Sequence, residues 1–362
     1  MKKEYKYASI FFAIIAVGIF SISYYYEEVD LKRITTDDSV IEDKTFLRKS
    51  PDLKGISGYI NTSQEEIDKH LEGKVVLYDF WTYSCINCIR TLPYLTAWDD
   101  KYSDEGLVIV GIHTPEFEFE KNYDNVVFAT EKFGIKYPVV QDNEKEIWSD
   151  FQNRYWPRKY IADHEGYIRF DHIGEGAYKE TEQVIQLLLE ERSNAIGKKI
   201  EKKELVDLDE FKHATFRTPE LYFGHKFAEG RNQLGNEEGF LINKIVEYNL
   251  PEQFKQHYFY MDGTWKNNND GMKLVSDSGK IILNFNAKQV NIVADGNAVL
   301  TVKYDGEIIP ENSRGIDINS EGNVIISEPR LYNLIELDQE GPHEIIIEVE
   351  TSDFEIFTFT FG

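Results

Sequence analysis

Hydrophobic residues follow two different patterns along this chain, and the change falls near residue 219. Between about residues 53 and 194, short apolar runs alternate with stretches of helical periodicity. Such alternation is typical of an α/β domain, in which helices cover both faces of a sheet. Strands are predicted at 58–61, 74–81, 107–112, 137–140, 159–162 and 167–171. Helices are predicted at about 63–71, 85–102, 120–133, 144–151 and 181–192.

The last part of the chain has short strand-like runs separated by turn residues. These runs lie at 281–285, 290–293, 299–304, 324–326, 332–337, 344–349 and 355–361. Asp305-Gly306 stands between two runs and is typical of a type I′ hairpin turn. The spacing predicts an antiparallel β-sandwich over residues 219–362. Residues 195–218 contain a short basic run and are predicted to link this domain to the α/β domain at 53–194.

The first residues contain a long uncharged stretch. Lysines near the N-terminus precede the run Tyr7–Tyr26, which would span about 30 Å as a helix, the thickness of a bilayer core. The lysines should stay in the cytoplasm, so we expect a single-pass anchor at 1–27 with the rest of the chain extracytoplasmic. A cleaved signal peptide, which would give a secreted protein, is the alternative, because Ser21-Ile22-Ser23 fits a cleavage site. Residues 28–52 are polar and predict a stalk.

Composition and charge narrow the class of protein. The chain has 362 residues, of which 41% are hydrophobic and 14% aromatic. This length and composition favour two compact domains over one core or a disordered chain. The formal charge is 40 − 64 = −24. Such a negative charge argues against a nucleic-acid partner, because the phosphate backbone would be repelled.

The sequence contains two cysteines, Cys85 and Cys88, between a predicted strand and a predicted helix. A Cys-x-x-Cys pair at such a junction is typical of a thioredoxin-like redox site. Cys85 lies where the helix N-terminus favours a thiolate, so we expect it to be the nucleophile, with a pKa below its usual value. Cys88 lies one helical turn further on and is the expected resolving thiol.

Two other residues are candidates for catalysis. Asp79 lies in the apolar run before the cysteines. Burial would raise its pKa and let it accept the proton of Cys88, whereas an edge position would leave it facing solvent. Pro157 follows Trp156 just before the strand predicted at 159–162. It is either a cis-proline facing the cysteines or part of an ordinary trans turn.

Three residues are candidates for substrate binding. The backbone at Trp156 would pair with an extended substrate chain if Pro157 faces the cysteines. Glu116 follows the strand predicted at 107–112, and loops at this end of a sheet line sites in α/β proteins. The alternative is a solvent-facing loop carboxylate. Trp81, at the end of the strand before the cysteines, is the third candidate.

Other chemistry at the cysteines fits less well. Haem attachment would need a histidine after Cys88, where the sequence has Ile89. A closed zinc site needs four ligands, and the sequence has no second Cys-x-x-Cys pair. A peroxidase of the peroxiredoxin type would carry a proline at Tyr78. We therefore expect no metal and no cofactor other than the redox-active Cys85–Cys88 disulfide.

The sequence around the cysteines resembles a known family. Residues Phe80–Pro93, which read FWTYSCINCIRTLP, are similar to the soluble part of DipZ-like thiol–disulfide reductases. These are exported members of the TlpA-like thioredoxin superfamily. Gly111–Lys121, Tyr137–Asn143 and Asn153–Pro157 carry the same resemblance. It is strong over about residues 59–189 and weaker to the end of the chain.

The resemblance implies both a fold and an activity. It makes Cys85 and Cys88 the redox pair, favours a buried Asp79 and a cis Pro157, and gives the last domain a jelly-roll fold like carbohydrate-binding modules. Trp265 would then be either a core residue or a sugar-stacking residue. The implied enzyme is an extracytoplasmic thiol–disulfide oxidoreductase that reduces or isomerises disulfides of exported proteins.

Two alternative functions and one partner complete the expectations. The chain could instead form disulfides as an oxidant, or it could be a redox-responsive binding protein that acts through its β-sandwich. Members of the family often carry a multi-span electron-transfer domain of CcdA type. Here a single hydrophobic segment stands in its place. We therefore expect a separate membrane electron donor of CcdA type.

Overall fold

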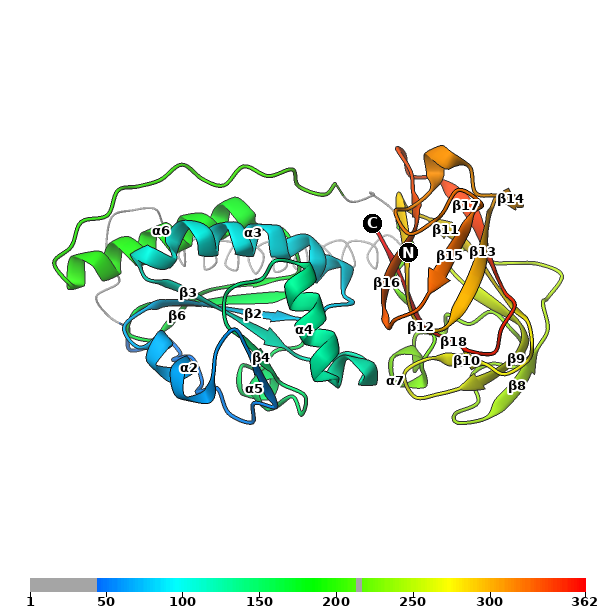
Figure 1. Ribbon diagram of the computed structural model, residues 1–362, viewed down its shortest axis with the longest axis horizontal. Coiled ribbons are helices and arrows are strands. Elements are labelled where there is room, and N and C mark those ends of the chain that lie inside the picture. The colour runs from blue at the N-terminus through cyan, green and yellow to red at the C-terminus, as the bar shows by residue number, and fades with distance from the viewer. Residues whose placement is uncertain (1–43, 213–216) are drawn as a thin grey trace, which may run out of the picture.

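The computed structural model describes residues 44–212 and 217–362. The predicted membrane anchor and most of the predicted stalk therefore lie outside the described residues. Within the part described, no helix is both long and apolar enough to cross a membrane. The described residues form an α/β domain and a β-domain that stand side by side (Figure 1). The connection between them runs along α3 (Ile86–Tyr102) and α6 (Tyr178–Ala195) of the first domain (Figure 1).

The α/β domain is built on a six-stranded sheet with the order β1-β4-β3-β2-β5-β6. Its strands are β1 Gly58–Ile60, β2 Val75–Trp81, β3 Leu107–His113, β4 Val139–Gln141, β5 Arg158–Ala162 and β6 Ile168–Ile173. Its helices are α2 Gln64–Leu71, α3 Ile86–Tyr102, α4 Tyr123–Lys132, α5 Glu146–Asp150 and α6 Tyr178–Ala195, with short 3-10 turns η1 Ser103–Glu105 and η2 Glu118–Lys121. The predicted elements are all present, although the helix predicted at 120–133 is divided into η2 and α4.

The central strand β2 shows why this domain forms. All seven of its residues are buried. Because successive side chains of a strand point to opposite faces, Val75 and Leu77 pack under α3, α4 and α6, whereas Val76 and Phe80 pack against α2 and α5. Burial on both faces explains the continuous apolar run in the sequence. The prediction of helices on both faces of the sheet is confirmed.

The β-domain is a twelve-stranded antiparallel sheet that curls around one core. Its strands are β7 Leu221–Tyr222, β8 Ile245–Tyr248, β9 Phe259–Asn267, β10 Met272–Leu274, β11 Gly279–Asn286, β12 Gln289–Gly296, β13 Ala298–Tyr304, β14 Glu307–Ile308, β15 Asn323–Ile326, β16 Arg330–Glu336, β17 Pro342–Val349 and β18 Phe354–Phe361, with a short helix α7 His225–Ala228. All seven predicted strands are present, and Asp305 and Gly306 form the predicted turn with positive φ angles. Strands β7 to β10 and β14 were not predicted.

Strand β9 joins the two halves of the curled sheet, because it pairs with strands of both halves. Its first half pairs with β11, and its second half pairs with β8 and β10. Gly263 lies between the halves with φ 93°, a left-handed conformation that lets the strand bend. Trp265 follows it, is fully buried, and donates from Nε1 to the Asp262 carbonyl oxygen at 2.8 Å. Trp265 is therefore a core residue, and the sugar-stacking alternative is wrong.

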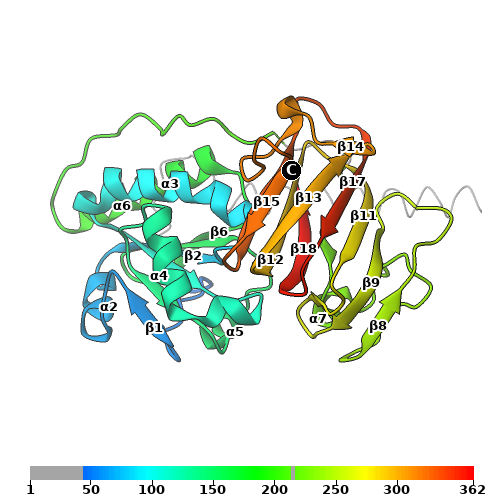
Figure 2. The ribbon, with the colours of Figure 1, turned by 45° about the vertical axis from the view of Figure 1, so that its right-hand side comes forward.

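Aromatic side chains hold the two domains together. Phe117 and Phe119, in the loop after β3, lie 5.3 and 4.7 Å from the ring of Phe357 in β18. The backbone N–H of Glu118 donates to a carboxylate oxygen of Asp270 at 3.0 Å. Figure 2, turned from the first view, shows the β-domain beside the α/β domain. Strands β12 and β15 lie on the side of the β-domain that is next to the α/β domain. The loop after β3 is therefore the main seam between the domains.

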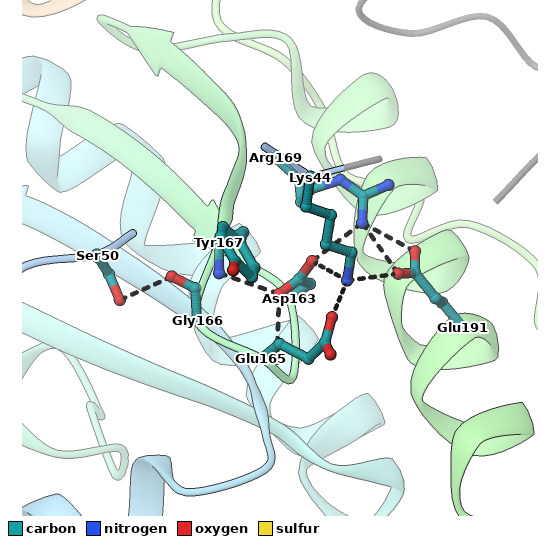
Figure 3. Close-up of polar contacts among 8 residues, drawn as sticks. All are labelled: Lys44, Ser50, Asp163, Glu165, Gly166, Tyr167, Arg169 and Glu191. Carbon is teal, nitrogen blue, oxygen red and sulfur yellow. Dashed lines mark hydrogen bonds and ion pairs between the residues drawn. The ribbon is translucent and has the colours of Figure 1, made fainter. Parts of the chain in front are cut away.

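The described end of the predicted stalk is folded onto the α/β domain. The Lys44 ammonium lies 2.8 Å from an Asp163 carboxylate oxygen and 3.2 Å from one of Glu191, and it also contacts Glu165 (Figure 3). Arg169 contacts Asp163 and Glu191 at 3.1 and 3.0 Å (Figure 3). Asp163 follows β5, whose register places it at the opposite end of the sheet from the cysteines. Residues from Lys44 onward therefore belong to the α/β domain, because Lys44 completes the carboxylate cluster of Asp163 and Glu191.

Candidate redox site

The two cysteines lie at the junction of β2 and α3. Cys85 is the N-cap of α3, and its Sγ accepts a hydrogen bond from the Cys88 N–H at 3.3 Å. Cys85 is half-buried, whereas Cys88 is 1% exposed. Both are free thiols. The arrangement gives the first cysteine access to a reaction partner and keeps the second beneath it, as expected for a nucleophile and a resolving thiol.

The predicted low pKa of Cys85 is wrong in direction. Burial raises the pKa of the Cys85 thiol, and hydrogen bonds from Cys88 offset part of the rise. The negative charges of Glu116 and Glu220 raise it further. Burial raises the pKa of Cys88 well above its usual value, so the effect is stronger there. The motif could not show this result, because burial by tertiary packing is its main cause and Glu220 comes from the segment that leads into the β-domain.

Asp79 and Lys159 form a buried pair below the cysteines. They face each other across β2 and β5 and are 1% and 0% exposed. Burial raises the pKa of Asp79 to about 7, against the opposing attraction of Lys159. Burial lowers the pKa of Lys159 to about 8, against the opposing charges of Asp79 and Cys88. The prediction of a buried Asp79 is confirmed, and the solvent-facing alternative is wrong.

Pro157 lies at the same end of the sheet as the cysteines. The Trp156–Pro157 peptide bond is cis, so the trans alternative is wrong. Strand β5 begins directly after it and pairs with β2, with Arg158 opposite Phe80. The Trp156 ring is held from two sides: Nε1 donates to the Thr114 carbonyl oxygen at 2.9 Å, and the ring lies 4.2 Å from that of Trp148.

Trp81 does not line the surface of the site. It is 0% exposed, because it points to the same face of the sheet as Leu77 and packs into the core under α3. Its ring meets the edge of His113 at 5.2 Å. Direct contact between Trp81 and a substrate is therefore excluded in this arrangement, which corrects the prediction. Trp81 instead supports the strand that carries the cysteine loop.

His113, also buried, is neutral. Burial lowers its pKa to about 3. Its Nε2 lies 3.4 Å from the Thr82 hydroxyl, and its ring stacks on Tyr83 at 5.6 Å. Within residues 44–212 and 217–362, no group of histidine, cysteine, aspartate and glutamate side chains could hold a metal ion. His113 therefore serves the packing behind the cysteine loop.

Glu116 faces the second domain and the cysteines. Its carboxylate lies 2.9 Å from the Tyr222 hydroxyl. Burial and the charges of Glu220 and Glu120 raise its pKa to about 8. The alternative of a solvent-facing loop carboxylate is wrong. Glu120 in η2 fixes this loop, because it accepts hydrogen bonds from the Ser84 hydroxyl and from the N–H groups of Glu116 and Phe117.

Sequence reasoning missed four residues of the site. Lys159 lies inside a predicted strand, but only the β2–β5 register shows that it faces Asp79. Glu120 lies in a helical turn whose inward face could not be told from its outward face. Glu220 and Tyr222 precede the predicted strands of the second domain, and no sequence signal pointed from there to the cysteines.

Comparison with known proteins agrees with the fold and the site. Residues 73–168 match a family model described as thioredoxin-like, and residues 218–362 match one described as thioredoxin-like C-terminal domain. Protein DipZ of Mycobacterium tuberculosis is 34% identical over 316 residues, which are 86% of this chain and 43% of DipZ. The thiol-disulfide oxidoreductase YkuV of Bacillus subtilis is 27% identical over 39% of this chain and 94% of YkuV.

A solved structure covers the first domain as well. The solution structure of a thioredoxin-like protein in the oxidized form is 26% identical and covers 40% of this chain and 97% of its own, with a TM-score of 0.36. The fold and the cysteine pair define a redox protein of thioredoxin type. The chain contains two regions that match thioredoxin-like family models, and it is similar to thiol–disulfide oxidoreductases. It spans less than half the length of DipZ.

Proposed function

We propose that this protein reduces or isomerises disulfides of exported proteins outside the cytoplasm, with Cys85 as nucleophile and Cys88 as resolving thiol. The observation that carries the proposal is the difference in burial between the two thiols at one helix N-terminus. The outer thiol can meet a substrate disulfide. The inner thiol can reach only Cys85.

The reaction has two exchange steps. The Cys85 thiolate attacks one sulfur of a substrate disulfide, the substrate S–S bond breaks, and the other substrate sulfur leaves as a thiolate that takes a proton. Cys88 then loses its proton to Asp79 and attacks Cys85 Sγ. The mixed disulfide breaks, the second substrate sulfur leaves and is protonated, and the Cys85–Cys88 disulfide remains. Asp79 suits this role because its pKa of about 7 lets it accept a proton near neutral pH.

The raised pKa of Cys85 supports reduction over oxidation. Strongly oxidising thioredoxin-like proteins owe their potential to a stabilised reduced form, and a low-pKa thiolate is part of that stabilisation. Here burial and two carboxylates oppose the thiolate. The reduced form therefore lacks the thiolate stabilisation that makes such proteins oxidising, which favours a donor of electrons.

Reduction of insulin with dithiothreitol as electron source tests the activity. We expect turnover by the wild type, no turnover by Cys85→Ser, and a trapped mixed disulfide with Cys88→Ser. No turnover by the wild type would favour the second candidate, a redox-responsive binding protein. The contact between the β-domain and the loop beside Cys85 is the observation in favour of that candidate.

The remaining parts of the proposal concern location and partners. Residues 1–27 would anchor the chain in the cell membrane, with secretion after signal cleavage as the alternative, and a separate CcdA-type protein would supply electrons. The β-domain would be a jelly-roll sandwich like those of carbohydrate-binding modules, which the curled antiparallel sheet around one core supports. Deletion of the donor should leave Cys85–Cys88 oxidised in cells, and an unchanged reduced fraction would exclude that donor.

A further inference from the structure

One hydroxyl group joins carboxylates on the two sides of the domain seam. Tyr222 lies in β7, which pairs with β18 at the edge of the β-domain, and it is 6% exposed. Its hydroxyl oxygen lies 2.9 Å from a carboxylate oxygen of Glu116 and 3.1 Å from one of Glu220. Glu116 belongs to the loop after β3 of the α/β domain. The three oxygens therefore form a single cluster across the seam.

Counting protons shows what this cluster must contain. A phenol carries one hydrogen, so Tyr222 can donate to one of the two carboxylates. The other close oxygen–oxygen contact would be repulsive unless a carboxyl proton lies in it. Glu116 is the natural carrier, because burial and the charge of Glu220 raise its pKa to about 8. At neutral pH the cluster therefore holds two protons, one on the Tyr222 phenol and one on a carboxyl group.

The cluster lies next to the packing around the nucleophile, because Phe119 packs both against the core that Cys85 contacts and against the aromatic group that contains Tyr222. The charges of both Glu116 and Glu220 act on the Cys85 thiol. Other charged groups lie around it on several elements. Glu120 and Lys145 act on Glu116, the Lys226 ammonium donates to the Glu116 carbonyl oxygen at 3.1 Å, and the Arg231 guanidinium lies 4.5 Å from the centre of the Tyr222 ring. Among the described residues, Lys145, Lys226 and Arg231 make no ion pair with the Glu116 or Glu220 carboxylate, so a proton neutralises one of the two charges.

We propose that Tyr222 and Glu220 complete the redox site from the β-domain side: with Glu116 they hold a shared proton, and the charge of this cluster adds to the effect of burial in lowering the acidity of Cys85. The inference rests on the proposed role of Cys85 as nucleophile. Tyr222 and Glu220 are positioning residues, since they act through the thiol and need not touch the substrate. The β-domain is then part of the reactive site and not only an attached binding module.

The pH dependence of Cys85 alkylation by iodoacetamide in the full chain tests the proposal. The midpoint of the profile reports the acidity of the thiol, whereas the plateau at high pH reports its accessibility. We expect Glu220→Gln to lower the midpoint by about half to one pH unit. At pH values below the midpoint, alkylation should then be about three to ten times faster than in the wild type, and the plateau at high pH should be unchanged. The double variant E116Q/E220Q should lower the midpoint further.

Two further variants separate charge at the cluster from other effects. Glu118→Gln removes a negative charge from the same loop at an exposed side chain, and it should leave the midpoint unchanged. Tyr222→Phe keeps the ring but removes the hydrogen bond that lowers the pKa of Glu116. Glu116 then stays protonated to higher pH, and the Cys85 midpoint should fall.

The outcomes decide between the proposal and its alternatives. An unshifted midpoint in Glu220→Gln would overturn it. A higher plateau with the same midpoint would also overturn it, because the substitution would then only open the seam. These alkylation profiles do not depend on whether the protein reduces insulin. A failure of the proposed function and a failure of this inference are therefore distinguishable.

Discussion

Asp79 and Lys159 face each other across β2 and β5, and each is almost completely removed from solvent. One oxygen of Asp79 has no hydrogen-bond partner among the described residues. A buried carboxylate that lacks full compensation takes up a proton easily. The pair therefore places a proton acceptor of nearly neutral pKa in the layer below Cys88.

Asp79→Asn should slow the second exchange step. Without the carboxylate, Cys88 loses its proposed base, so the lifetime of a mixed disulfide at Cys85 should rise by about 100-fold, a typical contribution of general base catalysis. The first step should change little. Stopped-flow measurement of both steps tests this, with the exposed Asp104→Asn as control. An unchanged lifetime would remove Asp79 from the mechanism.

The same pair predicts a pH dependence of stability. The pKa of Asp79 is 3.8 in an ordinary environment and about 7 in the fold, so the folded state holds a proton that the unfolded state has lost. The contribution of this residue is fully present below pH 3.8 and is lost as the pH rises to about 7.

Urea unfolding of wild type and Asp79→Asn across this range measures the effect. The free energy of unfolding of wild type, relative to the variant, should fall as the pH rises, by up to about 1.4 kcal/mol per pH unit. A difference that does not depend on pH would show that Asp79 keeps an ordinary pKa.

Lys44 should stabilise the α/β domain from the end opposite the cysteines. Its ammonium completes the cluster of Asp163, Glu191 and Arg169, in which the Asp163 side chain is fully buried (Figure 3). Lys44→Met should cost about 1–3 kcal/mol in the free energy of unfolding, because it leaves buried carboxylates with one cation fewer. The exposed pair Lys54–Asp52 offers a control, since Lys54→Met should change stability by about 0.5 kcal/mol or less. Equal effects would show that the cluster contributes no more than a surface pair.

Gly263 should be essential to the curl of the β-domain. A Cβ atom at this position would lie 2.9 Å from the Ser278 carbonyl oxygen, and the positive φ adds strain. Gly263→Ala should lower the free energy of unfolding by about 2–4 kcal/mol. Gly230→Ala is the matched control, because its φ is also positive but no atom lies within 4 Å of the added Cβ, so about 1 kcal/mol is expected. Similar losses in both variants would contradict the account of the bend.

Local patterns in the sequence were enough for much of this structure. The apolar run of β2 predicts a doubly buried strand, and the Cys85–Cys88 spacing predicts the redox pair. The position of Asp79 within that run left burial and a solvent-facing position open, and the family resemblance favoured burial. The strand and the redox pair depend on neighbours along the chain, which a sequence shows directly.

Pairings between distant segments could not be predicted in this way. The partner of Asp79 depends on the β2–β5 register, and the raised pKa of Cys85 depends on burial and, to a smaller extent, on Glu220 across the domain seam. The inward position of Trp81 depends on which face of β2 lies under α3. In each case the deciding contact is set by tertiary packing, for which a single sequence carries no local signal.

The reduction potential of the Cys85–Cys88 pair tests the central claim most directly. The protein is equilibrated in dithiothreitol and glutathione buffers, and the fraction of free Cys85 and Cys88 thiols is measured in each buffer. Because burial and carboxylates oppose the Cys85 thiolate, we predict a potential near about −270 mV, as in thioredoxin. A potential near about −120 mV, as in DsbA, would show an oxidant that forms disulfides and would contradict the account.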